Sequence, residues 1–194
     1  YAPSPAPTPG PTATRLAATV GADGAADARN FTELAAAVFC GAAAVDVRAA
    51  ELTFSEPLDV AEGAALTVAS SGAERAVLSG GGWEQLFHVY GTLTLRALVV
   101  TGGRADLDEC DEPYTTCAGG AIWVGTTGAV YASDCVFRNN TARQGGAIAW
   151  WYGWVEVSRS VFEHSVAAED GGALVDLKYG DAVIDRTLFA RNAA

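Results

Sequence analysis

The chain has 194 residues, half of them apolar, and a formal net charge of −11 with a pI of about 4.4. This length and apolar share suffice for one domain with a substantial core. The acidic balance, without any basic run, argues against binding to nucleic acid or an anionic membrane, and no apolar stretch of about 18 residues is present to span a bilayer.

Residues 1–15, YAPSPAPTPGPTATR, are rich in Pro, Thr, Ser and Ala. This composition cannot build a core and predicts a stiff, extended linker of the kind that separates extracellular modules. The chain begins with Tyr1 and carries no signal peptide. We therefore expect a processed or excised piece of a longer protein, with adjacent domains of the same chain among its partners.

Residues 16–40 are predicted to form an N-terminal cap made of a strand and a helix. The strand is expected at 16–20, and Asn30 with Glu33 has the spacing of a capping box. Apolar residues then recur at helical spacing: Phe31, Leu34, Val38 and Phe39. A short amphipathic helix here would cover the open end of the first coil.

Residues 45–90 are predicted to form irregular first coils of the same domain. Their short alternating pairs are Val45/Val47, Leu58/Val60, Leu66/Val68 and Val77/Leu78.

Three Gly-Gly-Ala segments begin at Gly119, Gly145 and Gly171, 26 residues apart. Each is followed 17 or 18 residues later by a Phe: Phe137, Phe162 and Phe189. A fixed period in this range indicates a stack of small units, each of which buries its apolar face against its neighbours.

Within each unit the alternation is that of a strand, with two slots on one inward face. The slots hold Leu93, Val130, Val155 and Ala182, and two residues later Leu95, Ala132, Val157 and Ile184. Three short strands per turn, with tight corners and no room for a crossover helix, predict an all-β parallel β-helix over 41–194, in which the three Phe rings stack inside.

The GGAI segments at 119–122 and 145–148, GGAL at 171–174, and the Phe-x-x-Asn pairs Phe137/Asn140 and Phe189/Asn192 resemble polymorphic outer-membrane-protein repeats. That family is best known from chlamydial surface proteins, and similar repeats occur in other extracellular proteins. The resemblance covers about residues 91–194 and implies a right-handed parallel β-helix of the pectate-lyase-like superfold at the cell surface. Phe162 departs from the pattern, because Ser165 follows it where an Asn is expected.

Asn140 and Asn192 occupy the same corner, where Asn tolerates left-handed backbone and stacks in a hydrogen-bonded ladder from coil to coil. Ser165 breaks this predicted ladder. The next Gly-Gly would be due beyond Ala194, so we expect the coils of 41–194 to be truncated at the C-terminus.

One corner carries an insertion of about ten residues relative to the later coils. It contains Cys110 and Cys117, which we expect to form a local disulfide in an oxidising compartment. Five carboxylates share the loop: Asp106, Asp108, Glu109, Asp111 and Glu112. They are a weak candidate site for Ca²⁺, against the simpler interpretation of a solvated acidic loop tip, and no other cofactor is expected.

Two further cysteines and two sequons complete the candidate modification sites. Cys135 falls in a core slot and is expected to behave as a small buried hydrophobe, whereas the state of Cys40 cannot be read. Asn30 and Asn139 begin N-glycosylation sequons, which are meaningful only in a eukaryotic secretory pathway.

Catalytic candidates are few. Glu156 and Asp185 are the only outward carboxylates in the repeats that come close to a pair, with a separation of about 8 Å that inverting glycosidases use. Single exposed carboxylates on strands are, however, ordinary solvating groups. His88 and His164 neighbour no nucleophile or second metal ligand in the predicted register, so no metal site is expected there.

Aromatic residues gather at one predicted corner of the later coils. They are Trp150, Trp151, Tyr152, Trp154 and Tyr179. Stacked about 4.8 Å apart, they could present flat faces to sugar rings, or they could reinforce the corner or contact an adjacent module.

Two functions therefore remain open. The first is a non-catalytic surface module for adhesion, scaffolding or contact with extracellular glycans and surface proteins. The second is a polysaccharide lyase or glycoside hydrolase of the same superfold. Fold alone does not separate them.

Overall fold

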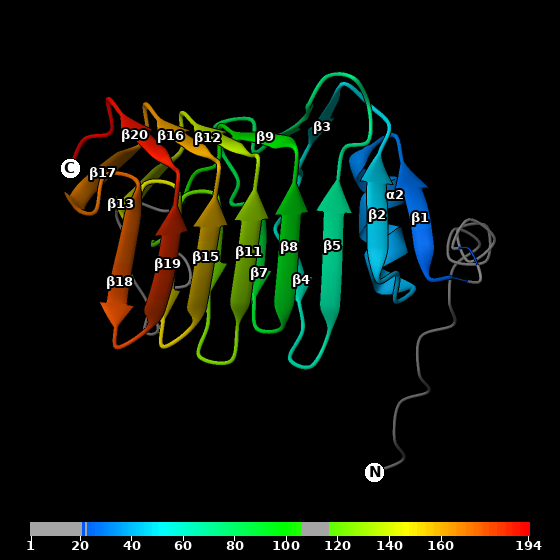
Figure 1. Cartoon of the computed structure of the whole chain (residues 1–194), viewed down its shortest axis with the longest axis horizontal. Coiled ribbons are helices and arrows are strands. Elements are labelled where there is room, and N and C mark those ends of the chain that lie inside the picture. The colour runs from blue at the N-terminus through cyan, green and yellow to red at the C-terminus, as the bar shows by residue number, and fades with distance from the viewer. Residues whose placement is uncertain (1–20, 22, 106–116) are drawn as a thin grey trace, which may run out of the picture.

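The chain winds as a right-handed parallel β-helix along a single axis, with the N-terminal cap at one end and residue 194 at the other (Figure 1). The computed structural model describes residues 21, 23–105 and 117–194. All strand pairs within its sheets are parallel, so each coil pairs with the coil before and after it. The predicted fold class is confirmed.

Three long sheets and one short sheet make the walls of the helix. Sheet A contains β1 (Ala25–Ala28), β2 (Ala44–Val47), β5 (Ala65–Ala69), β8 (Thr92–Arg96), β11 (Ala129–Ser133), β15 (Trp154–Ser158) and β19 (Asp181–Asp185). Sheet B contains β3 (Glu51–Thr53), β6 (Ala76–Ser79), β9 (Leu98–Thr101), β12 (Val136–Arg138), β16 (Val161–Glu163) and β20 (Leu188–Ala190). Sheet C contains β4 (Leu58–Val60), β7 (Phe87–Val89), β10 (Ile122–Val124), β14 (Ile148–Trp151) and β18 (Leu174–Lys178). The short sheet D pairs β13 (Thr141–Gln144) with β17 (Val166–Asp170).

The core is a set of inward columns in the predicted register. Val130 pairs with Leu93 on one side and Val155 on the other, and all three are fully buried. The rings of Phe137 and Phe162 stack at 4.6 Å between centroids, with their planes nearly parallel. Burying each such ring contributes about 1.5–3 kcal/mol, so the stack is a main source of stability.

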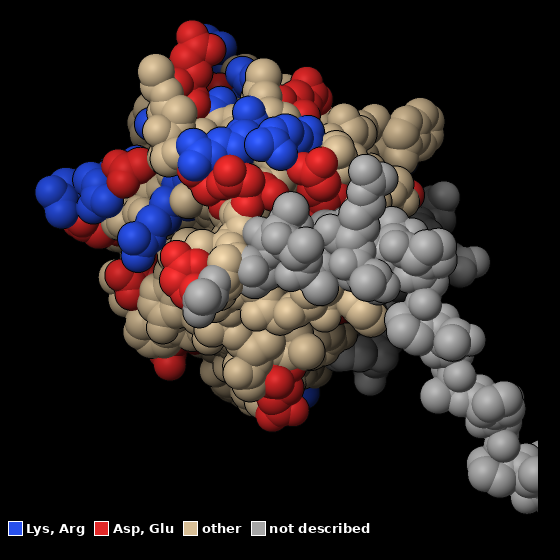
Figure 2. Space-filling view, turned by 90° about the vertical axis from the view of Figure 1, so that its right-hand side faces the viewer, with Lys and Arg blue, Asp and Glu red and all other residues tan. Residues whose placement is uncertain are grey.

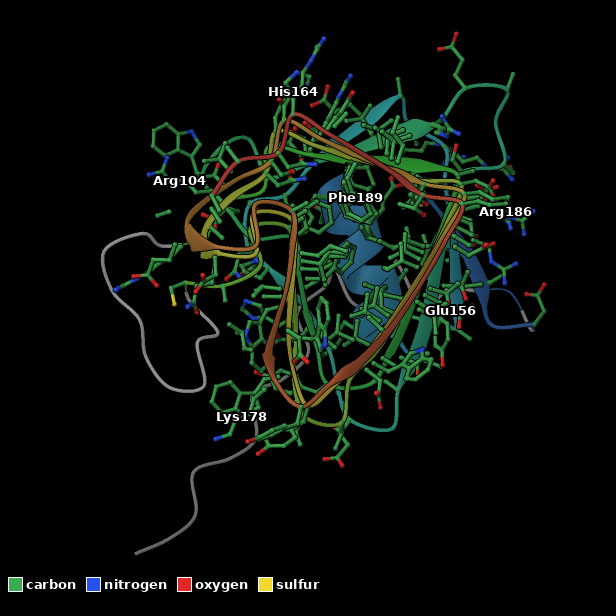
Figure 3. The ribbon with its side chains drawn as sticks, turned by 60° about the vertical axis from the view of Figure 1, so that its left-hand side comes forward. Arg104, Glu156, His164, Lys178, Arg186 and Phe189 are labelled. Carbon is green, nitrogen blue, oxygen red and sulfur yellow. The ribbon has the colours of Figure 1, made fainter. Side chains whose placement is uncertain are left out.

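The third ring of this column is less protected. Phe189 stacks on Phe162 at 5.1 Å and lies inside the outline of the coil (Figure 3). It keeps 45% of its surface exposed, because no further coil among the described residues covers its outer face.

A short helix, α2 (Phe31–Phe39), covers the N-terminal end of the coils. The Asn30 side chain accepts a hydrogen bond from the Glu33 N–H at 2.9 Å, as the capping box predicts. The Glu33 carboxylate in turn accepts from the Arg29 N–H. Leu34 is fully buried, and the Phe31 ring packs on Phe54 at 4.9 Å, which ties the helix to the first coil.

Basic and acidic side chains are interleaved on the N-terminal side of the molecule (Figure 2). Arg48 lies between Asp27, at 3.2 Å, and Asp46, at 3.0 Å. Such exposed pairs contribute little to stability, but they leave no continuous basic surface around Arg48. This agrees with the absence of a basic run in the sequence.

Candidate functional site

The turn from sheet C to sheet A carries a cluster of aromatic rings, called here the aromatic corner and made of the half-buried Trp151 and the exposed Tyr152 and Tyr179. Tyr152 and Tyr179 both have left-handed backbone, with φ of 59° and 48°. They are 43% and 83% exposed. The Trp151 and Tyr152 ring centroids are 6.2 Å apart, and those of Tyr152 and Tyr179 are 6.0 Å apart. These distances make one continuous aromatic surface across two coils.

Glycine at the aromatic corner allows the backbone to pass close to a core side chain. A Cβ added at Gly180 would lie 2.3 Å from Cδ1 of Trp150. Only a residue without a side chain permits this approach, so the Tyr-Gly pair at each corner turns the chain sharply and leaves the Tyr ring outside.

The positively charged side chain of Lys178 lies over two of these rings. The Lys178 Nζ is 5.0 Å from the centroid of the Trp151 ring and 6.0 Å from that of Tyr152, within the range of cation–π attraction (Figure 3). Sequence alignment of the coils does not place Lys178 beside Trp151. A bulge between β14 and β18 does so, because the register shifts after Trp150. The Asp176 carboxylate shapes this bulge by accepting hydrogen bonds from the Lys178 and Gly180 N–H groups.

Two of the five predicted contact residues lie elsewhere. Trp150 is only 6% exposed and belongs to the core, which corrects the expectation that its ring lies on the exterior. It stands two residues after the inward Ile148, in the column of Val124, and Gly180 leaves room for its ring because a Cβ there would collide with it. Trp154 is half-buried at the start of β15.

Trp151 rests on an apolar cluster on the outer face of sheet C that the sequence did not indicate. Trp123, Ala149 and Ala118 are buried there, and Trp151 packs against them with Val175 and Leu177. Trp123 is only 1% exposed although it points away from the main core. The sequence does contain a sign of this cluster, because Trp123 aligns with the apolar Ala149 of the adjacent coil. Outward positions, however, are ordinarily expected to be solvated.

The outer face of sheet A has a shallow hollow of about 220 Å³, called here the sheet A hollow. Its lining residues are Thr94, Arg96, Tyr131, Ala132, Ser133, Glu156 and Ser158. The Glu156 side chain points away from the interior of the coil (Figure 3), and it lines this hollow. Asp185, the other catalytic candidate, is not among the lining residues and instead pairs with Arg186 at 2.8 Å.

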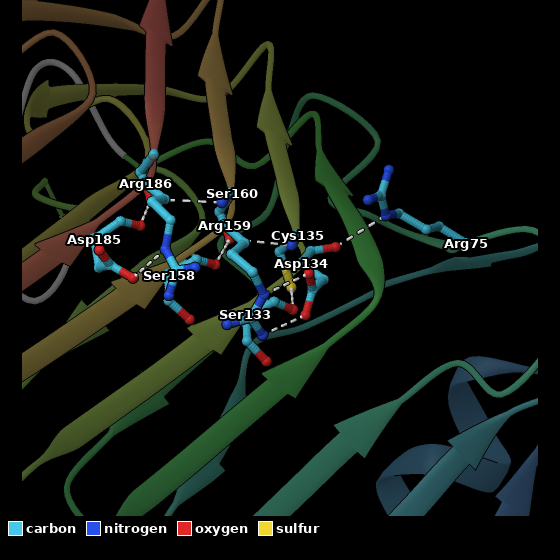
Figure 4. A network of polar contacts seen from close by, with 10 residues as sticks. Arg75, Ser133, Asp134, Cys135, Ser158, Arg159, Ser160, Asp185 and Arg186 are labelled. Atoms are coloured by element: carbon cyan, nitrogen blue, oxygen red, sulfur yellow. Dashed lines mark hydrogen bonds and ion pairs between the residues drawn. The ribbon is translucent and has the colours of Figure 1, made fainter.

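Polar contacts join the coils at the turn from sheet A to sheet B (Figure 4). Arg159 holds Asp134 through two hydrogen bonds of 3.0 and 2.7 Å, and Arg75 donates to the Asp134 carbonyl. The hydrogen bond from Arg159 keeps the pKa of the Asp134 carboxyl below its usual value. The Ser160 hydroxyl accepts from the Cys135 N–H and donates to the Ser158 carbonyl, so it links two coils.

The described cysteines differ in state. Cys40 is a free, exposed thiol, and Cys135 is a free, buried thiol whose pKa is raised by burial to about 11. Cys135 thus occupies the core slot expected of it. Cys117 is fully buried and is not among the free cysteines. Cys110 lies outside the described residues, so the Cys110–Cys117 bridge stays a prediction.

The acidic candidates for Ca²⁺ also lie outside the described residues: Asp106, Asp108, Glu109, Asp111 and Glu112. Elsewhere, in residues 21, 23–105 and 117–194, no group of three or more His, Cys, Asp or Glu is placed to hold a metal ion. Both sequon asparagines are exposed: Asn30 caps α2, and Asn139 has left-handed backbone at a corner.

His88 has polar partners that the predicted register did not reveal. Its Nδ1 lies 3.2 Å from the Asp59 carboxylate, and its Nε2 lies 3.1 Å from the Gln85 Oε1. The Gln85 amide nitrogen donates to the carbonyls of Ala118 and Gly119, so its oxygen is free to accept and His88 Nε2 is the donor. The network joins three coils and contains no nucleophile.

The fold and its repeated corners define a parallel β-helix repeat protein. Residues 134–149 match the family model of the Chlamydia polymorphic membrane protein (Chlamydia_PMP) repeat. The matched stretch includes Phe137, Asn140 and the segment 145–148, so the chain carries a repeat of this family, as the sequence motifs predicted. Comparison with curated proteins and with solved structures gives no significant match. No helix in the described part of the chain has the length and apolar character needed to cross a membrane.

Proposed function

We propose that this chain is a non-catalytic, surface-exposed β-helix module that contacts glycans or surface proteins through the aromatic corner. The repeat at 134–149 supports a surface module of the polymorphic membrane protein type. The single observation that carries the binding role is the aromatic surface formed by the exposed Tyr152 and Tyr179 and the half-buried Trp151, with Lys178 beside it.

Exposed rings on a rigid support lose little conformational entropy on binding and can stack on the apolar face of a sugar. The apolar cluster beneath Trp151 fixes that ring, and the left-handed corners project the Tyr rings outward. Lys178 adds a positive charge to an otherwise acidic molecule and would favour ligands with an acceptor group next to the ring contact.

The test is a glycan-array screen followed by titration of the glycans that bind. Replacing Trp151 and Tyr152 together by Ala should weaken binding about tenfold or more, because two stacking contacts are lost. Phe39→Ala, which removes an exposed ring (84% exposed) on the cap helix, is the matched control and should leave binding unchanged.

Two results would contradict the proposal. One is full binding by the Trp151/Tyr152 double variant while its thermal unfolding matches that of the unchanged protein. The other is turnover, measured as new reducing ends or unsaturated products from a bound polysaccharide, which would favour the lyase or hydrolase alternative.

A further inference from the structure

A second polar surface, away from the aromatic corner, lies in the middle of sheet A. Three adjacent strands, β8, β11 and β15, each present two outward side chains to the sheet A hollow. Thr94 and Arg96 come from the first strand, Tyr131 and Ser133 from the second, and Glu156 and Ser158 from the third. Charged groups of opposite sign therefore lie at diagonal corners of the hollow, with an aromatic ring and hydroxyls between them.

Among the described residues Arg96 has no carboxylate partner, although the chain carries a net charge of −11. Its neighbours in the sheet are Ala69 and Ser133, and no ion pair among the described residues includes it. The arginines at the nearby turn differ, since Arg159 and Arg186 are each held by an aspartate. The Arg96 guanidinium is exposed and keeps its planar fork of donors for a ligand.

Glu156 and Tyr131 likewise lack such partners among the described residues. No hydrogen bond or ion pair within the described chain uses the Glu156 carboxylate, which is half-buried beside the hollow. Tyr131 is 38% exposed and makes no ring contact among the described aromatic residues. Its direct neighbours in the sheet are Thr94 and Glu156, so Tyr131 stands on the strand between the two strands that carry the charged groups.

We propose that the sheet A hollow binds an oligosaccharide in which one carboxylate-bearing sugar is linked to a neutral sugar. The Arg96 fork binds the carboxylate through paired hydrogen bonds, as guanidinium groups do. The Tyr131 ring supports the apolar face of a sugar ring, and Glu156 accepts hydrogen bonds from the hydroxyls of the neutral unit. The serine and threonine hydroxyls of the hollow complete the polar contacts.

The geometry sets the direction and the selectivity of this binding. Neighbouring coils lie about 4.8 Å apart, so β8 and β15 are about 10 Å apart and the oligosaccharide runs along the helix axis. A second carboxylate at the Glu156 end would be repelled, so a uniformly acidic oligosaccharide binds more weakly than a mixed one.

Three probes separate these properties in calorimetric titrations of the folded chain. A hyaluronan tetrasaccharide alternates acidic and neutral sugars, an oligogalacturonate of the same length is acidic throughout, and a chitotetraose is neutral. We expect the hyaluronan fragment to bind most tightly of the three. Arg96→Gln should weaken its binding about 10- to 100-fold, and Arg96→Lys should recover only part of the loss. Arg138→Gln, on sheet B, is the control and should change nothing.

Glu156→Gln gives the most specific readout. It should reduce the preference for the hyaluronan fragment over the oligogalacturonate, because the repelling charge is gone while the hydrogen-bonding shape remains. The proposal is overturned if Arg96→Gln leaves the hyaluronan affinity unchanged, if oligogalacturonate binds more tightly than hyaluronan, or if none of the probes binds at millimolar concentration. Loss of binding in the Trp151/Tyr152 double variant, with full binding in Arg96→Gln, would support the aromatic corner and overturn the sheet A site.

Discussion

Two coils of the helix follow the same backbone course but differ in the side-chain hydrogen bonds at the corner after sheet B. At the first, the Asn140 side chain donates to the Val100 carbonyl and accepts from the Gly103 N–H, at 3.2 and 2.9 Å. At the next, Ser165 is equally buried, but its hydroxyl oxygen has no hydrogen-bond partner within the described chain. The backbone therefore does not require an Asn at this corner, and the side-chain bonds are an addition to the sheet.

The comparison also corrects the predicted ladder of stacked asparagines. Asn192 repeats the geometry of Asn140, donating to the Phe162 carbonyl and accepting from the Ser165 N–H. Each Asn thus bonds to the backbone of the coil before it and not to another Asn. The Asn of the Phe-x-x-Asn motif links consecutive coils by two side-chain hydrogen bonds. Among these three corners, only the one at Ser165 lacks this link.

The largest expected effect on stability comes from removing the two hydrogen bonds of the Asn140 side chain. Asn140→Ala should lower the free energy of unfolding by about 3 kcal/mol, because the Gly103 N–H and the Val100 carbonyl would lose their buried partner. Ser165→Ala should change it by less than about 0.5 kcal/mol, since the hydroxyl makes no bond. Denaturant unfolding of both variants measures the difference. Equal losses would show that the corner depends on packing and not on the Asn bonds.

A smaller effect of opposite sign is expected from introducing the same two hydrogen bonds at position 165. Ser165→Asn should raise the free energy of unfolding by about 1 kcal/mol, because the new side chain can reach the Phe137 carbonyl and the Asn140 N–H. The gain is smaller than the loss at Asn140 since the coil must make room for a larger group. Ser165→Leu, which fills space without hydrogen bonds, is the control, and a Leu variant as stable as the Asn variant would contradict this account.

The smallest effect is expected at the neighbouring turn, where coils are joined by an exposed ion pair. Arg159→Gln should destabilise the protein only slightly at neutral pH. The pKa of Asp134 is lowered in the folded protein, so the pair stabilises above the unfolded pKa of about 3.9 and loses this effect as the pH falls through the folded value. Unfolding midpoints of the two proteins should therefore converge in acid, and a constant difference down to about pH 2 would contradict the assignment.

The repeat period predicted the fold and the register because every coil must place the same slots over the same core. Phe137 and Phe162 stack where the alignment put them. The inward position of Trp150 was also readable, since it lies two residues after Ile148 on the same strand face. Residue type alone favours an exterior corner for such a large ring, whereas the alternation places it inside.

Other features of the candidate sites could not be read from the repeats. Lys178 reaches Trp151 through a bulge, and a local shift of register leaves no periodic signal. Asp59 and His88 meet in the irregular early coils, which lack the repeats needed for alignment. The outward position of Glu156 was predicted, but only the structure shows that Arg96 faces the same hollow and that neither charge has an ionic partner among the described residues.

The parallel pairing of every coil also determines how the molecule would respond to force. The backbone hydrogen bonds between coils run along the axis of the rod, and in the sheets of the described chain each strand pairs only with the strands of adjacent coils. Tension applied through the two ends of the rod would therefore load one layer of bonds at a time. The chain would peel coil by coil at low force and lengthen greatly, whereas a sheet pulled along its strands resists with all its bonds at once.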